Sequence, residues 1–159
     1  MQKRRFVAVV GDGLCGPETA EVARQVGRLL AERGGAVVCG GLGGVMAAAC
    51  RGAKEAGGLT VGILPGDDAR QANPYVDVPV VTGMGEARNV LVVKTAEAVI
   101  AVEGRYGTLS EIALALKLGK PVVGLNTWEL ARGGQVDPGI QPAATPLEAV
   151  ERALTGGEG

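Results

Sequence analysis

The chain has 159 residues, of which 47% are hydrophobic and 21% charged, which is typical of a folded domain and excludes a disordered chain. Its formal net charge of −1 argues against a nucleic-acid-binding surface, and the one basic run, at residues 3–5, precedes the first predicted strand. Histidine is absent, which excludes Ser-His-Asp and Cys-His catalysis and histidine-ligated metals.

Short apolar runs alternate with helix-like stretches along the chain. Most of these runs are continuously apolar, which favours strands covered on both faces of a parallel sheet. The predicted strands are Phe6–Val10, Ala36–Cys39, Thr60–Leu64, Val78–Thr82, Ala98–Val102 and Pro121–Leu125. The predicted helices are Glu18–Arg33, Val45–Ala56, Glu86–Thr95 and Thr108–Leu118, with a last helix beginning at the capping box Thr145-Pro146-Leu147-Glu148.

This alternation predicts an α/β fold, a three-layer Rossmann-like doubly wound parallel sheet of about six or seven strands. Two segments have no clear helix or strand pattern. Pro65–Asp77 is a candidate crossover at the topological switch point, and Trp128–Ala144 is expected to be a long loop before the last helix. We find no repeat, linker or second domain, so we expect one domain over residues 1–159.

Glycines gather just after the predicted strands. In an open parallel sheet these positions share the carboxyl edge, where helix N-termini direct free N–H groups at a bound ligand. An α/β fold needs glycine turns in any case, but two of the clusters hold more glycine than a turn requires. We therefore expect a phosphate or another anion at this edge. The glycines are Gly11, Gly13, Gly16, Gly40, Gly41, Gly43, Gly44, Gly66, Gly83, Gly85, Gly104 and Gly107.

The run Gly11-Asp-Gly-Leu-Cys-Gly16 matches the G-x-G-x-x-G pattern after a strand, yet it does not predict NAD binding. A dinucleotide site also requires an acidic residue at the end of the second strand, and that strand ends in Cys39-Gly40-Gly41. Asp12 would in addition place a negative charge near the pyrophosphate. No Walker A loop is present, because Gly119-Lys120 is followed by proline.

The most informative stretch is Glu103-Gly-Arg-Tyr-Gly-Thr-Leu-Ser-Glu111, which follows the fifth predicted strand. Thr108 and Glu111 have the spacing of a capping box, which would place Thr108 at the N-cap and Glu111 in the first helical turn without any substrate. Arg88, near the start of the preceding helix, is either a solvated charge or a ligand-binding group. Because adjacent parallel strands end at one edge, we expect Arg88 and Glu111 to lie near each other.

These residues resemble a known family. Gly40-Gly-Leu-Gly-Gly-Val-Met46, Arg88 and Gly104-x-x-Gly-Thr-x-x-Glu111 resemble the LONELY GUY group of phosphoribohydrolases, long mislabelled as lysine decarboxylases. The resemblance covers roughly residues 5 to 127. The run from Gly107 to Pro121 is typical of a branch of short bacterial proteins that includes the molybdenum-cofactor carrier proteins, and the chain is even more similar to that branch.

The resemblance implies a nucleotide-binding hydrolase that cleaves the N-glycosidic bond of a purine nucleoside 5′-monophosphate to free base and ribose 5-phosphate, with no required cofactor. Arg88 and Glu111 would be the catalytic residues, because a carboxylate near an oxocarbenium-like transition state stabilises it or activates water. The alternative is a protein without catalysis, either a molybdopterin carrier or a nucleotide sensor. The implied ligand-binding residues are Gly13, Gly41, Gly43, Gly44, Met46, Gly104, Arg105, Tyr106, Gly107 and Thr108.

Two residues depart from the Pro-Gly-Gly sequence of the family's phosphate loop. Arg105 replaces a glycine whose backbone should approach the phosphate, and Glu103 adds negative charge. Arg105 could contribute a charge-assisted phosphate contact. Alternatively, the loop serves another ligand or no longer supports turnover.

The remaining patterns concern assembly and location. Helices 86–96 and 109–118 are apolar nearly all round, so we expect them to form the interface of a homodimer or a higher homo-oligomer. Cys15, Cys39 and Cys50 lack metal-ligand spacing and are expected to be reduced thiols, two of them in the core. No apolar run reaches the roughly 20 residues that span a membrane, and no signal peptide is visible, so we expect a cytoplasmic protein.

Overall fold

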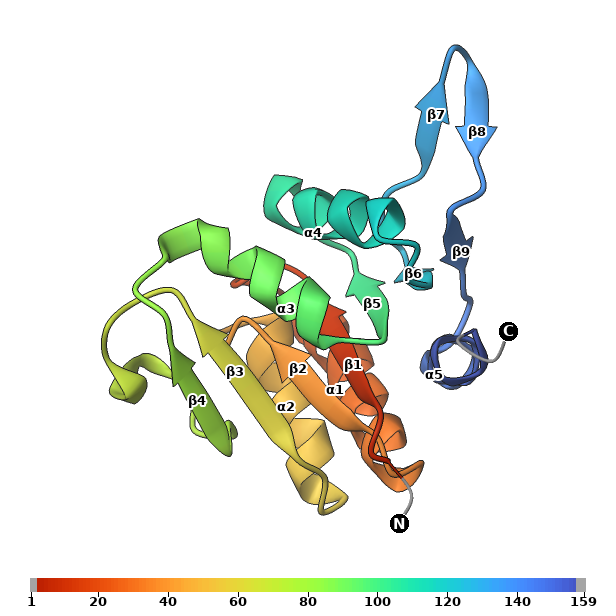
Figure 1. Cartoon of the computed structure of the whole chain (residues 1–159). Helices are drawn as coiled ribbons and strands as arrows, with labels where there is room; N and C mark the ends of the chain where they lie inside the picture. The colour runs from red at the N-terminus through yellow and green to blue at the C-terminus, as the bar shows by residue number, and fades with distance from the viewer. Residues whose placement is uncertain (1–2, 157–159) are drawn as a thin grey trace.

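The computed structural model describes residues 3–156, over which the chain folds into a seven-stranded parallel sheet flanked by helices (Figure 1). The strand order is β4-β3-β2-β1-β5-β6-β9, which confirms the predicted Rossmann-like α/β architecture. The predicted domain over residues 1–159 also includes residues 1–2 and 157–159, which lie outside the described residues. The strands of this sheet are β1 (Phe6–Val10), β2 (Ala36–Cys39), β3 (Thr60–Leu64), β4 (Val78–Val81), β5 (Ala98–Val102), β6 (Val122–Leu125) and β9 (Ile140–Pro142).

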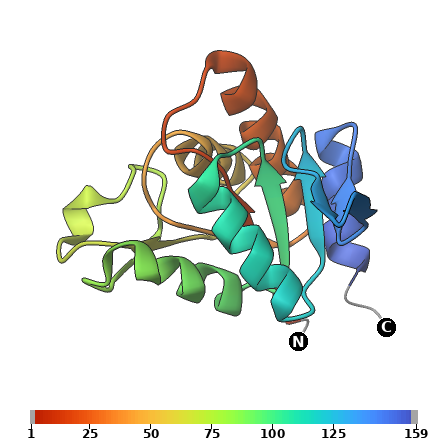
Figure 2. The same ribbon diagram turned by 90° about the horizontal axis from the view of Figure 1, so that it is seen from above.

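Helices cover both faces of the sheet and complete three layers (Figure 2). One face packs on α1, α2 and α5 through a core that includes Val9, Val26 and Ile100. The other face packs on α3 and α4 through Val10, Val99 and Ile112. The helices are α1 (Pro17–Glu32), α2 (Val45–Glu55), α3 (Asn89–Thr95), α4 (Tyr106–Lys117) and α5 (Pro146–Thr155), with the 3-10 helices η1 (Ala69–Gln71) and η2 (Gly85–Arg88).

The prediction of a long loop over Trp128–Ala144 was wrong. This segment forms the antiparallel hairpin of β7 (Leu130–Arg132) and β8 (Gln135–Asp137), followed by β9 on the edge of the main sheet. Gly133 and Gly134 turn the hairpin with φ values of 59° and 79°, a conformation that favours glycine. Strands of three residues are too short for an alternating pattern to be visible in the sequence.

The predicted capping box at Thr108 was also wrong. Helix α4 begins at Tyr106, with Arg105 at the N-cap, so Thr108 lies inside the first turn as a buried residue and Glu111 lies beyond that turn. The cause is Gly104, whose φ of 96° turns the chain into the helix early. The capping box of α5 is confirmed in its main contact, because the Oγ1 atom of Thr145 accepts the backbone N–H of Glu148 at 3.1 Å.

Two further segments differ from the prediction in detail. The predicted helix over 86–95 begins as the 3-10 helix η2 and continues as α3, and the crossover over 65–77 contains the short 3-10 helix η1. Strand β4 is exposed along its length rather than covered on both faces. It lies at the edge of the sheet, where a proline such as Pro79 is tolerated because only one side of the strand is paired.

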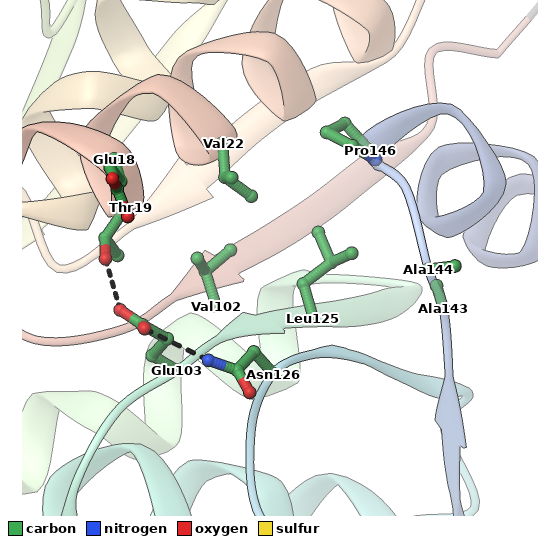
Figure 3. A pocket seen from close by; sticks show the side chains of 10 residues that line it. All are labelled: Glu18, Thr19, Val22, Val102, Glu103, Leu125, Asn126, Ala143, Ala144 and Pro146. Atoms are coloured by element: carbon green, nitrogen blue, oxygen red, sulfur yellow. Dashed lines mark hydrogen bonds between the residues drawn. The ribbon is translucent and has the colours of Figure 1, made fainter.

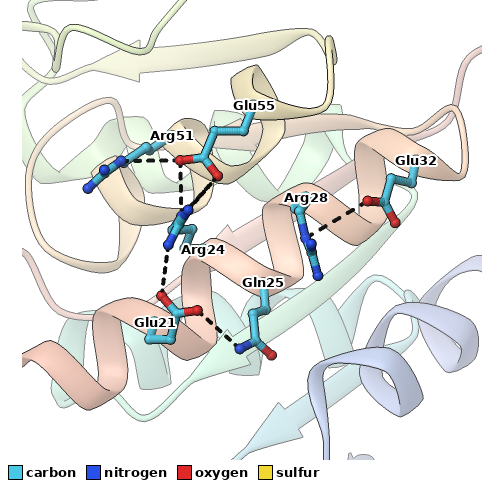
Figure 4. Close-up of polar contacts among 7 residues, drawn as sticks. All are labelled: Glu21, Arg24, Gln25, Arg28, Glu32, Arg51 and Glu55. Carbon is cyan, nitrogen blue, oxygen red and sulfur yellow. Dashed lines mark hydrogen bonds and ion pairs between the residues drawn. The ribbon is translucent and has the colours of Figure 1, made fainter.

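Helices α1 and α2 approach each other closely at two glycines. A Cβ atom on Gly27 would lie 1.9 Å from the backbone oxygen of Ala49, and one on Gly52 would lie 1.8 Å from that of Arg24. Beside this contact, Arg24 on α1 forms an ion pair with Glu55 on α2, which joins the two helices, and a second ion pair with Glu21 on α1 (Figure 4). Exposed ion pairs of this kind add little stability, so the glycine contact sets the helix spacing.

Candidate functional site

A cavity of about 400 Å³ opens at the carboxyl edge of the sheet, beside the point where the strand order reverses between β1 and β5. Loops after β1 and β2 form one side of it, and η2 and α4 form the other. Six of the residues predicted from the sequence line this cavity: Gly13, Met46, Arg88, Gly107, Thr108 and Glu111. The position agrees with the general rule that open α/β sheets bind ligands at the switch point.

Arg88 is the most constrained charge in the cavity. Its side chain leaves the end of η2, and the residue is only 8% exposed. One terminal nitrogen, Nη1, donates to the Oδ1 atom of Asn89, and the other, Nη2, donates to the backbone oxygen of Gly40 at 3.4 Å. Both acceptors are uncharged, and within residues 3–156 the Nε atom has no hydrogen-bond partner.

A buried cation is costly unless an anion neutralises it. Over the described part of the chain, no carboxylate lies within ion-pair distance of the Arg88 guanidinium. Arg88 therefore provides a positive charge without an ion-pair partner at the wall of the cavity. This arrangement suits an anionic ligand.

Glu111 reaches the same cavity from α4. Burial raises the pKa of its carboxyl group to about 7, and the positive charge of Arg88 opposes this rise. Glu111 therefore holds its proton to a higher pH than an exposed glutamate does. Among the described lining residues Arg88 is the one cation, Asp12 is paired with Arg105, and Glu86 lies exposed at the same cavity.

The glycine-rich loop after β2 packs tightly at the cavity. A Cβ atom on Gly40 would lie 2.8 Å from the Sδ atom of Met46 and 2.9 Å from Nη2 of Arg88, so glycine is what allows Arg88 to lie against the end of β2. Gly43 and Gly44 pack on the backbone of the first loop instead of lining the cavity, and Gly41 packs against β3. These three predicted residues shape the loop without facing the ligand space.

The predicted residues 104–106 also lie outside the cavity lining. Gly104 packs against the side chain of Thr108, and Tyr106 is 78% exposed, with its ring centroid 5.6 Å from that of Trp128. Arg105 forms an ion pair with Asp12, with 3.2 Å between Nε and Oδ2. This exposed pair connects the loops after β1 and β5 at the rim of the cavity.

Two residues at the cavity were missed or given a different role from the sequence. Asn89 holds the guanidinium of Arg88, and its position directly after Arg88 was the available signal. Asp12 was interpreted as a charge that disfavours phosphate, but in the fold it is paired with Arg105. Glu103, the other unwelcome charge, does not line this cavity, because its side chain bonds to Thr19 and Asn126.

The cysteines agree with the sequence prediction of free thiols with two in the core. Cys39 and Cys50 are buried with 3.5 Å between their sulfur atoms, and Cys15 is partly buried. In residues 3–156, no group of three metal-binding side chains is found. Over the same residues, no helix has the length and apolarity needed to cross a membrane.

The chain matches one protein family and is similar to several known proteins. The model of the SLOG cluster4 family matches residues 4–150. An uncharacterized protein from Archaeoglobus fulgidus is 44% identical over 149 residues, which are 94% of each chain. The solved structure of the molybdenum cofactor binding protein from Rippkaea orientalis is 36% identical, with a TM-score of 0.88 and 98% of each chain covered. A solved Moco carrier protein from Chlamydomonas reinhardtii is 35% identical, with a TM-score of 0.82, 97% of this chain and 99% of the other covered.

Proposed function

The chain belongs to the SLOG cluster4 family, and on that premise we propose that it is a carrier that binds a phosphate-bearing pterin of the molybdenum-cofactor type. The observation that carries the proposal is the buried guanidinium of Arg88, whose charge has no carboxylate partner and whose Nε atom has no acceptor among the described residues. Similar proteins of nearly equal length are named for binding or carrying the molybdenum cofactor. Arg88 would hold the phosphate of such a ligand.

The other cavity residues fit this role. Arg88 is fixed by Asn89 and Gly40, so its position is set before a ligand arrives, which lowers the entropic cost of binding. Gly107 and Thr108 bring the first turn of α4 to the cavity, where its free N–H groups add positive potential. The residues therefore supply a charge, donors and a preformed shape without any catalytic step.

Titration calorimetry with ribose 5-phosphate as an anionic probe tests the phosphate site directly. We expect wild-type protein to bind it, Arg88→Met to lose binding by roughly tenfold or more, and Arg88→Lys to retain part of the affinity because it keeps the charge. Arg132→Met removes the same charge from the exposed hairpin and serves as the matched control. Equal affinities for Arg88→Met and wild type would contradict a phosphate site at Arg88.

The cargo is tested separately. The protein is expressed in a host that makes the molybdenum cofactor, purified, and analysed for pterin fluorescence and for molybdenum. We expect both to accompany wild-type protein and the molybdenum to be depleted in Arg88→Met. Absence of both from wild-type protein would contradict the carrier role while leaving the phosphate site to the calorimetry.

One observation favours a second function, hydrolysis of the N-glycosidic bond of a nucleoside 5′-monophosphate. Glu111 lines the same cavity as Arg88, and its raised pKa of about 7 suits a group that exchanges protons near neutral pH. Incubation with AMP, GMP, IMP and CMP followed by assay for free base tests this activity. Release of base by wild type and its loss in Glu111→Gln would support the hydrolase, and no release of any base would exclude it for these substrates.

A further inference from the structure

A second cavity, of about 450 Å³, opens at the carboxyl ends of β5 and β6 between the first turns of α1 and α5 (Figure 3). It shares no lining residue with the Arg88 cavity. Val22, Val102 and Leu125 form an apolar wall, and polar groups make up a comparable share of the lining. A cavity of this size that combines an apolar wall with polar groups can hold a small molecule. The polar lining side chains are Glu18, Thr19, Glu103 and Asn126.

Glu103 is held rigidly at one end of this second cavity. The hydroxyl of Thr19 donates to its Oε2 atom, and the side-chain amide of Asn126 donates to its Oε1 atom at 3.2 Å, as Figure 3 shows. Thr127 also donates to the backbone oxygen of Glu103. A carboxylate has about four acceptor positions, so these two side-chain bonds leave one position free on each oxygen.

The charge of the second cavity selects against phosphate. Its ten described lining residues include the carboxylates of Glu18 and Glu103 but no lysine or arginine. The capping box of α5 already uses the N–H group of Glu148. A ligand that donates hydrogen bonds and presents a flat apolar surface suits this cavity, whereas an anion would be repelled.

We propose that this second cavity binds a flat, uncharged nitrogen heterocycle in which an amino group stands next to a ring N–H, the arrangement found on guanine and on pterin. Two adjacent N–H donors match the two oxygens of a fixed carboxylate and form a pair of charge-assisted hydrogen bonds. The ring would pack against Val22, Val102 and Leu125. Glu103 thus has a function on the face of the sheet covered by α1 and α5, separate from the phosphate site.

The test uses two closely matched ligands at neutral pH, pterin and lumazine, and follows binding by ligand fluorescence. Lumazine has an oxygen in place of the amino group, so it presents an acceptor to Glu103 and loses one of the two hydrogen bonds. We expect wild-type protein to bind pterin at least about tenfold more tightly than lumazine, the usual size of a bidentate discrimination. Glu103→Gln should weaken pterin binding by a similar factor and remove the preference.

Three further variants make the result specific. Glu18→Gln removes a charge from the exposed rim of the same cavity and should keep the preference for pterin. Val22→Trp fills the cavity and should abolish binding of both ligands, a test that stands even if Glu103→Gln fails to fold. Arg88→Met should bind pterin normally, which separates this proposal from the carrier function. Equal wild-type affinities for pterin and lumazine, or normal pterin binding by Val22→Trp, would overturn the proposal.

Discussion

Arg88 and Glu111 are both unfavourable for the protein without ligand. The guanidinium of Arg88 is buried with only uncharged acceptors, and Glu111 is buried enough to raise its pKa to about 7. Buried charges of this kind cluster at binding and catalytic sites. A bound anion would neutralise Arg88, and protonation of Glu111 removes the second charge.

We predict that Glu111→Gln stabilises the protein at alkaline pH. The folded pKa of about 7 lies above the ordinary value of 4.5, so the folded state holds a proton that the unfolded state has released. Wild-type stability therefore falls as the pH rises from about 4.5 to about 7, and it stays lower above that range. The glutamine variant lacks this loss, so at pH 8 it should be more stable by up to about 3 kcal/mol. Urea unfolding measured at several pH values checks this.

Glu86→Gln is the matched control for that measurement, because Glu86 lines the same cavity but is exposed. We expect its stability to follow the wild-type pH dependence. If Glu111→Gln were instead less stable than wild type at pH 8, the attraction between Glu111 and Arg88 would outweigh the cost of burying the carboxylate, and the prediction would be wrong.

At the scale of elements, the close contact between α1 and α2 depends on Gly27 and Gly52, which have no side chain. We predict that Gly52→Ala destabilises the protein by about 3 kcal/mol, because its Cβ atom would lie 1.8 Å from a backbone oxygen and the helices must move apart. Alanine gains about 1 kcal/mol over glycine in helix propensity, which is too little to offset the clash. The shift of the urea midpoint measures the difference.

Gly16→Ala provides the control at the beginning of α1. A Cβ atom there would meet nothing within 4 Å, and the φ of −76° is allowed for alanine. Because Gly16 is the N-cap of α1, where alanine is less favourable than glycine, the stability of this variant should fall by no more than about 1 kcal/mol. A Gly52→Ala variant as stable as Gly16→Ala would show that α1 and α2 can separate freely.

The sequence predicted the long elements well because each has a strong pattern. The strands β1, β2, β3 and β5 begin and end where their apolar runs do. Three features had no such pattern: the short strands β7, β8 and β9, the early beginning of α4, and the direction of Glu103. The direction of Glu103 depends on a φ of 50° that a glutamate rarely adopts, so its turn away from the Arg88 cavity could not be predicted from the sequence.

The candidate site was predicted in part for the same reason. Arg88 and Glu111 follow strands that end at one edge, so the topology alone brings them to one cavity. Gly41, Gly43, Gly44, Gly104, Arg105 and Tyr106 belong to the correct loops but do not line the cavity. Which glycine faces a ligand and which faces a neighbouring backbone depends on packing, and spacing does not reveal it.

At the scale of the molecule, the layer formed by α3 and α4 keeps more apolar surface than the core can use. The core takes Val92 and Val93 from α3, and Ile112 and Ala115 from α4. Apolar side chains on the other side of these helices remain accessible. The large ones that are exposed in these helices or directly after them are Val90 at 39%, Tyr106 at 78% and Leu118 at 41%.

We predict that this surface forms a homodimer or a higher homo-oligomer, because apolar surface on two sides of a helix needs two partners. Sedimentation equilibrium should give a mass that is a multiple of 16.0 kDa. The double variant Val90→Lys with Leu118→Lys should shift the protein to monomer, since it places two charges on the surface that the oligomer would bury. Val136→Lys is the control, because it introduces the same charge at an apolar residue that is 58% exposed on β8. It should leave the assembly intact. A wild-type mass of one chain at working concentration, or dissociation by Val136→Lys alone, would contradict an interface through α3 and α4.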